Sequence, residues 1–71
     1  MENHLTEREM SVLFYLAQGL TNEEISEKLH MTVHTVKAHL EAIYDKLAVS
    51  NRVQAAMKAV VLDLIDLNVM V

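Results

Sequence analysis

Four polar residues that favour the position just before an α-helix divide this chain. They are Thr6, Thr21, Thr32 and Asn51. Glu9 follows Thr6 by three residues and Glu24 follows Thr21 by the same distance, which is the spacing of a capping box. The chain contains no proline and a single glycine, so little in it would break a helix between these points. The sequence therefore predicts four helices, at residues 7–18, 22–29, 33–47 and 52–67.

The third predicted helix has one apolar side and one polar side. Its apolar residues recur at alternating intervals of three and four positions, which places them in one narrow stripe: Val33, Val36, Leu40, Ile43 and Leu47. The opposite side carries His34, Ala38, Glu41 and Asp45, with Lys37 and Ala42 at its edges. A helix buried on all sides would not carry such residues, so we expect this one to present its polar side to a partner.

The fourth predicted helix is apolar almost all the way round. One side, which we expect to face the core, has Val53, Met57, Val60, Leu64 and Leu67. The opposite side has a stripe of Ala55, Ala59 and Leu62. A helix of this kind is buried on both sides or shared with a second molecule. The sequence therefore predicts a homodimer with Ala55, Ala59 and Leu62 at a two-fold interface.

The length and the order of these elements indicate one all-α domain. A chain of 71 residues has room for one small core, so we expect residues 1–71 to form a single four-helix bundle. Two helices joined by a tight turn form a helix-turn-helix, here predicted at 22–41. No cysteine is present to form a disulfide, and no apolar stretch is long enough to span a bilayer. The polar N-terminus is unlike a secretory signal, so we expect a cytoplasmic protein.

The net charge of −4 counts against nucleic-acid binding, because phosphate contacts need lysine and arginine. The distribution of charge is more informative than its total. Residues 32–58 carry four basic and two acidic residues, whereas the segments on either side are acidic. Positive charge therefore gathers around the third predicted helix and the start of the fourth.

Several short motifs follow one another along residues 5–60. They are Leu5-Thr6-x-Arg8-Glu9-x-x-Val12-Leu13, Gly19-Leu20-Thr21-Asn22-x-Glu24-Ile25-Ser26-x-x-Leu29, Thr35-Val36-Lys37-x-His39, Lys46-Leu47 and Arg52-x-Gln54-Ala55. In this order and spacing the chain resembles the LuxR/NarL/FixJ-type helix-turn-helix domain. The resemblance implies sequence-specific binding of double-stranded DNA, with the third helix in the major groove and a dimer formed through the fourth helix.

The same resemblance implies a role for the protein as a whole. Such domains are usually the C-terminal output half of a two-component response regulator or of a quorum-sensing receptor, and some stand alone, similar to GerE. The implied function is bacterial transcriptional regulation, with RNA polymerase as a further partner. Five positions depart from the family pattern. Thr32 replaces the usual serine, Ala42 a frequent asparagine and Ala48 a common glycine, while Glu41 and Asp45 stand where polar or basic residues are frequent.

The third predicted helix supplies the first candidates for DNA contacts. The resemblance brings Lys37 to DNA, where a lysine neutralises a phosphate or donates to guanine O6 and N7; the alternative is an ordinary solvated lysine. His34 and Ala38 lie in the first turns, the part that meets base edges in this docking mode. Thr35 lies to the side and suits a phosphate equally well. Glu41 lies one turn beyond Ala38, where it would face base edges or phosphates.

The second helix and the turn before the fourth supply further candidates. Thr21 and Asn22 open the second helix, where free amides favour a phosphate in addition to the capping role. Lys46 and Arg52 lie around the turn into the fourth helix. Each either contacts the DNA backbone or forms an internal ion pair with Glu9 or Glu24.

Neither metal binding nor catalysis is expected. His30 and His34 are four residues apart, but Thr32 starts a new helix between them, so they do not share a helical face. Cysteine ligands are missing and no glycine-rich phosphate loop is present. We therefore predict a non-enzymatic domain without metal, cofactor or small-molecule ligand. The alternative to DNA binding is a protein-interaction module on the same fold, which the net charge of −4 favours.

Overall fold

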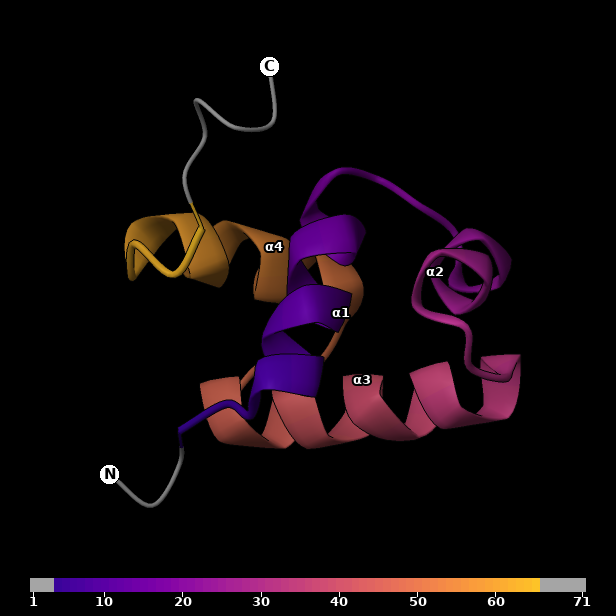
Figure 1. Cartoon of the computed structure of the whole chain (residues 1–71). Helices are drawn as coiled ribbons and strands as arrows, with labels where there is room; N and C mark the ends of the chain where they lie inside the picture. Colours follow the sequence, from indigo (N-terminus) through magenta and orange to yellow (C-terminus); the bar gives the residue numbers. More distant parts are fainter. Residues whose placement is uncertain (1–3, 66–71) are drawn as a thin grey trace.

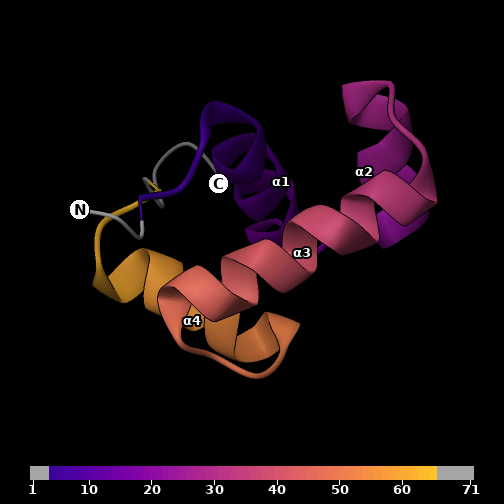
Figure 2. The same cartoon turned by 90° about the horizontal axis from the view of Figure 1, so that it is seen from below.

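The computed structural model describes residues 4–65, which form four helices (Figure 1). They are α1 (Glu7–Ala17), α2 (Asn22–Leu29), α3 (Val33–Leu47) and α4 (Arg52–Val61). No strand occurs within residues 4–65, so the all-α prediction is confirmed. Helix α1 stands between α2 and α4, and α3 lies across its end. Seen from below, α3 runs the length of the molecule, with α2 near its start and α4 near its end (Figure 2).

Each helix begins directly after the polar capping residue that the sequence predicts. The Thr6 hydroxyl accepts a hydrogen bond from the Glu9 amide at 3.1 Å, and the Thr6 amide donates to Glu9 Oε1 at 2.9 Å. Thr21 and Glu24 form the same reciprocal pair at 3.2 and 2.8 Å. In the last two helices, the backbone amides of Thr35 and Gln54 donate hydrogen bonds of 3.1 and 2.9 Å to the side chains of Thr32 and Asn51. These bonds satisfy amides that have no partner in the first helical turn, and each contributes about 1 kcal/mol.

The four helices also end in one common way. A residue in the left-handed conformation follows each helix: Gly19 (φ 92°), His30 (φ 56°), Ala48 (φ 58°) and Asp63 (φ 60°). The amide of the next residue donates to the carbonyl five positions back, at distances of 2.8 to 3.2 Å. That next residue is apolar and half-buried in each case: Leu20, Met31, Val49 and Leu64. The arrangement is a Schellman motif, in which the apolar residue folds back on the helix that it ends.

Two helix ends differ from the prediction. Helix α4 ends at Val61 and not at position 67, because the left-handed turn at Asp63 reverses the chain and brings Ile65 into the core. Positions 66 and 67 of the predicted helix lie outside the described residues. Helix α1 ends at Ala17, one residue before the predicted end, with Gln18 as its C-cap.

The core is one cluster to which every helix contributes. Its buried apolar residues are Val12, Leu13, Leu16, Ile25, Val36, Leu40, Ile43, Leu47, Ala55, Ala59 and Ile65. The stripe predicted for α3 is confirmed, with Val33 half-buried and the other four positions buried. Helix α2 places a single residue, Ile25, among these buried side chains. Its attachment to the core therefore depends on Ile25, on the half-buried Leu29 that packs against the cluster, and on the polar contacts at its two ends.

Helix α4 packs with the side opposite to the one expected. Ala55 and Ala59 are 0% exposed, whereas Val53 and Met57 are 64% and 63% exposed. The predicted interface role of the two alanines is therefore wrong, because their side chains already lie within the core of one chain. Alanine lets α4 approach α1 and α3 closely, and a helix that is apolar all round gives no pattern that distinguishes its sides. Leu62, the third residue of the predicted interface, is 50% exposed.

Candidate nucleic-acid interface

The side of α3 that faces away from the core carries four of the predicted contact residues. His34, Lys37, Ala38 and Glu41 are all exposed. His34, Ala38 and Glu41 are spaced by four and three positions, so they lie one above another along the helix, and Lys37 lies at their edge. We name these four residues the outward face of α3. The structure brings them together as the sequence predicts.

Thr35 differs from these residues because it takes part in the cap of α3. Its amide donates to Thr32 Oγ1 at 3.1 Å, and its hydroxyl oxygen accepts from the Thr32 hydroxyl at 3.0 Å. The side chain of Thr35 is half-buried. The hydroxyl hydrogen of Thr35 is not used in these bonds, so it is available to a phosphate oxygen.

The start of α2 forms a second group of polar atoms. Thr21 is exposed, and its capping role is confirmed by the bond from the Glu24 amide. The Glu24 carboxylate accepts a hydrogen bond from the Thr21 amide and so takes part in the cap. Asn22 is half-buried, and its Oδ1 accepts from Nη1 of Arg52 at 3.2 Å. The two candidate phosphate contacts of α2 therefore lie side by side at the first residues of that helix.

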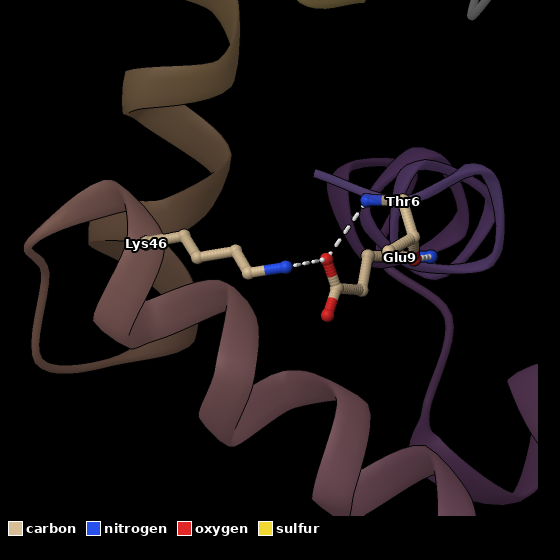
Figure 3. Close-up of polar contacts among 3 residues, drawn as sticks. All are labelled: Thr6, Glu9 and Lys46. Carbon is tan, nitrogen blue, oxygen red and sulfur yellow. Dashed lines mark hydrogen bonds and ion pairs between the residues drawn. The ribbon is translucent and has the colours of Figure 1, made fainter. Parts of the chain in front are cut away.

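Lys46 forms an internal ion pair and does not join the outward face. Its Nζ lies 2.7 Å from Oε1 of Glu9, and the same oxygen accepts from the Thr6 amide (Figure 3). The side chains of Lys46 and Glu9 are 26% and 8% exposed. Nine residues separate Lys46 from Lys37, which places them on opposite sides of α3. The structure thus gives Lys46 the internal role that the sequence left open, in place of a contact beside Lys37.

The carboxyl group of Glu9 titrates differently from an exposed one. Burial disfavours its charged form and by itself would raise the pKa. Two hydrogen bonds, from Lys46 and from the Thr6 amide, favour the charged form, and so does electrostatic attraction to Lys46 and His39. Together these outweigh the effect of burial and hold the pKa of Glu9 below its usual value. The ionised pair therefore ties the start of α1 to the end of α3.

Two arginines hold the two ends of α2. Nη1 of Arg52 donates to Asn22, and Nη2 of Arg52 donates to the Leu20 carbonyl at 2.5 Å. At the other end, Nη2 of Arg8 donates to the Leu29 carbonyl at 3.3 Å. An ion pair of Arg52 with Glu9 or Glu24, one of the two roles that the sequence suggested, is therefore wrong, because both hydrogen-bond partners of Arg52 are neutral. Sequence reasoning missed the two contacts, since no periodic signal links residues so far apart in the chain.

The three histidines between α2 and the middle of α3 lie in different settings. His30 occupies the left-handed turn after α2, His34 belongs to the outward face of α3, and His39 is half-buried. Within residues 4–65, no group of three or more histidine, cysteine or acidic side chains is placed to hold a metal ion. No helix in the same range has the length and apolar character needed to cross a membrane.

The family of this chain is decided by its match to a family model. Residues 3–59 match the model of a family described as bacterial regulatory proteins, luxR family. The chain belongs to the luxR family. This luxR-family chain is 51% identical over 55 residues to transcriptional regulatory protein LiaR of Bacillus subtilis (strain 168), a match that covers 78% of the chain and 26% of LiaR. Over 56 residues it is 55% identical to transcriptional regulatory protein LnrK of the same organism, covering 79% and 26% of the two chains.

Other relatives agree with this assignment. Response regulator protein VraR of Staphylococcus aureus (strain NCTC 8325 / PS 47) is 47% identical over 55 residues, which cover 78% of this chain and 26% of VraR. The crystal structure of response regulator ChrA in a heme-sensing two-component system superposes with a TM-score of 0.84 at 44% identity, covering 87% of this chain and 31% of ChrA.

These matches confirm the resemblance found in the sequence. LuxR-type domains are DNA-binding helix-turn-helix domains, and the names of the relatives are those of regulators rather than enzymes. The luxR-family chain spans 26% of the length of the curated relatives described above. The activities of those full-length proteins are therefore not assigned to this chain.

Proposed function

We propose that this luxR-family domain binds double-stranded DNA at specific sequences and regulates transcription, with α3 in the major groove. The observation that carries the proposal is the outward face of α3, whose four polar or small residues lie opposite a fully apolar stripe. An α-helix fits the major groove, and base edges there present a distinct pattern of donors and acceptors for each base pair. The helix-turn-helix family match agrees with this use of α3.

The residues of the outward face have different roles in this mode. Lys37 neutralises a phosphate or donates to a guanine edge. His34 hydrogen-bonds a base edge, and the methyl group of Ala38 contacts a thymine methyl. Glu41 lies one turn further along, close to base edges or to adjacent phosphates. Thr35 uses its remaining hydroxyl hydrogen on a phosphate.

The start of α2 fixes the position of the domain on the DNA backbone. Thr21 and Asn22 lie where the unpaired amides of the first helical turn point outward, and such amides favour an anionic phosphate. Contacts of this kind set the register of the protein on the duplex without reading its sequence. In this mode α2 therefore crosses the backbone while α3 enters the groove.

Two copies of the domain are needed for tight binding. Lys46 forms an internal ion pair with Glu9, so fewer cations remain for phosphates than the sequence count implies. Affinity for DNA depends strongly on the number of phosphates neutralised. A single domain is therefore expected to bind weakly, and a pair to bind half-sites about one helical turn apart.

The dimer forms through α4, on the side opposite to that predicted from the sequence. Val53, Met57 and Val61 follow one another at intervals of four and form an exposed apolar stripe. Val61 is 79% exposed, and the C-cap residue Leu62 next to it is 50% exposed. Exposed apolar residues gathered on one helix mark an interaction surface, and a two-fold axis lets the same surface meet its copy.

The DNA-binding proposal is tested by selecting duplexes from a random pool and measuring the affinity of variants for the selected site. Lys37→Ala should weaken binding by about 1–3 kcal/mol, because it removes a contact of the outward face. Lys58→Ala removes the same charge from α4 and should leave the preferred sequence unchanged. If Lys37→Ala bound like the wild type, the docking of α3 described above would be excluded.

The dimer proposal is tested by sedimentation. Replacing Met57 by glutamine and Val61 by threonine keeps the shapes and the net charge but makes the stripe polar, so the double variant should dissociate at concentrations where the wild type is a dimer. Glu27→Gln on α2 is the control, since it changes an exposed residue far from α4 along the chain. An unchanged monomer–dimer equilibrium in the double variant would rule out this surface.

A protein-interaction module on the same fold is the second candidate. The net charge of −4 and the exposed acidic residues of α2 and α3 favour it: Glu23, Glu24, Glu27, Glu41 and Asp45. RNA polymerase is a partner compatible with either function, and both place the protein in the bacterial cytoplasm. A salt titration separates them, because DNA affinity falls as a power of salt concentration with an exponent of about 0.9 per neutralised phosphate. Absence of duplex binding even at low salt would favour the second candidate.

A further inference from the structure

Arg52 joins two parts of the molecule that are separate in the sequence. It is the first residue of α4, and its guanidinium donates to Asn22 Oδ1 at 3.2 Å and to the Leu20 carbonyl at 2.5 Å. The guanidinium thus spans the turn before α2 and the first residue of α2. A shallow hollow of about 310 Å³ opens at this place and is lined by Gly19, Leu20, Thr21, Asn22, Glu23 and Arg52. The contact therefore lies at the surface where the backbone of bound DNA would pass.

The chemistry of the two side chains fixes the orientation of Asn22. A guanidinium group only donates hydrogen bonds, so the oxygen of the Asn22 amide must face Arg52. The amide nitrogen of Asn22, with its two hydrogens, is then turned away from Arg52. Within residues 4–65 the Asn22 side chain makes no other hydrogen bond to protein. Within the described residues no buried side-chain nitrogen or oxygen lacks a hydrogen-bond partner, so this unpartnered NH₂ group is accessible to solvent.

Helix α2 relies on such contacts for its position. Ile25 is its only fully buried side chain, and the turn before it contains Gly19 in a left-handed conformation. The far end of α2 is held by Arg8 through the Leu29 carbonyl. At the near end, Arg52 is the side chain that ties α2 to α4.

We propose that Arg52 is a positioning residue for DNA recognition: it orients the Asn22 amide so that its NH₂ group donates to a backbone phosphate. The inference rests on the proposed DNA binding and deepens it. In this arrangement Asn22 makes the phosphate contact, while Nη1 and Nη2 of Arg52 each use one hydrogen on a protein oxygen. It also links α4, which carries the apolar stripe of the dimer, to the residue that meets the DNA backbone.

Asn22→Asp tests the orientation, because aspartate has the same shape and keeps an oxygen toward Arg52. The variant replaces the outward NH₂ by a carboxylate oxygen, so binding to the selected duplex should weaken by on the order of tenfold or more, while thermal stability is kept or raised. Gln54→Glu is the matched control, since it adds the same charge and keeps the oxygen that accepts from the Ser50 amide. Equal affinities of Asn22→Asp and Gln54→Glu would overturn the inference.

A double-mutant cycle tests whether Arg52 acts through Asn22. Arg52→Lys keeps the net charge but loses the forked geometry, and it should weaken DNA binding in the wild-type background by on the order of tenfold. In the Asn22→Ala background the same change should have little further effect. An undiminished effect there would show that Arg52 acts on DNA or on general stability by itself, and the inference would be wrong.

Nuclear magnetic resonance of the free protein gives a readout that needs no DNA. The side-chain NH₂ signals of Asn22 should move toward those of an unrestrained asparagine in Arg52→Lys, and unchanged signals would overturn the inference. Failure of the proposed function has a different signature: the wild type would then select no duplex, and Lys37→Ala would make no difference. Selective binding by the wild type without coupling between Arg52 and Asn22 would reject the inference alone.

Discussion

Ala48→Gly should stabilise the domain, although glycine usually destabilises a helical protein. Ala48 follows the last residue of α3 with a φ of 58° and is exposed, so its methyl group makes no core contact that the substitution would lose. The left-handed conformation costs an L-residue about 1–2 kcal/mol, while the extra freedom of glycine in the unfolded chain costs about 0.5–1 kcal/mol. The net stabilisation is about 0.5–1 kcal/mol, which corresponds to a rise of about 2–8 °C in Tm for a domain of this size.

Urea unfolding followed by circular dichroism measures this change directly, and Ala38→Gly is the matched control. Ala38 lies within α3 and is also exposed, so the same chemical change there meets ordinary helical backbone. It should destabilise the domain by about 1 kcal/mol. The reasoning requires opposite signs at the two positions. A loss of stability in Ala48→Gly similar to that in Ala38→Gly would refute it.

Three further substitutions test the ion pair and the charge of the interface. Lys46→Met leaves the Glu9 carboxylate buried without its cation and should destabilise the fold by about 1–3 kcal/mol in denaturant titrations. The pKa of Glu9 is lowered in the folded state, so its contribution is present above the unfolded-state pKa and is lost as pH falls through the folded-state pKa. The stability difference between wild type and Glu9→Gln should therefore shrink on acidification, and a constant difference would contradict this. Glu41→Lys should tighten binding to all duplexes and steepen the salt dependence by about one phosphate. If it also abolishes preference at one base pair, Glu41 accepts from a cytosine amino group; no change in affinity, salt dependence or preference would place Glu41 outside the interface.

The features that could be predicted from sequence are those encoded locally. The starts of all four helices follow from polar residues such as Thr6 and Asn51, whose side chains bond to amides three residues away. The outward face of α3 follows from a stripe that is apolar on one side only. Both signals lie within a single helix, so tertiary packing does not alter them.

The features that were missed depend on packing between helices. The apolar residues of α4 surround the helix, so the choice of Ala55 over Met57 as the buried side is decided by how closely α4 approaches its neighbours. The left-handed turns at Ala48 and Asp63 contain no glycine, the residue that usually indicates such a turn in a sequence. The contact between Arg52 and Asn22 joins positions 30 residues apart and has no counterpart in a local pattern.

Helix α2 has a single fully buried side chain, and this affects its hydrogen exchange. Elements with few buried side chains open locally at a lower free energy than the rest of a domain. With Ile25 as its one buried anchor, α2 should exchange its amide hydrogens faster than α1 and α3 in the free domain. Bound DNA that contacts Asn22 would slow this exchange, whereas the core of α3 would already be protected before binding. Deuterium uptake by α2 would thus report whether DNA is bound, at a helix with a single fully buried side chain.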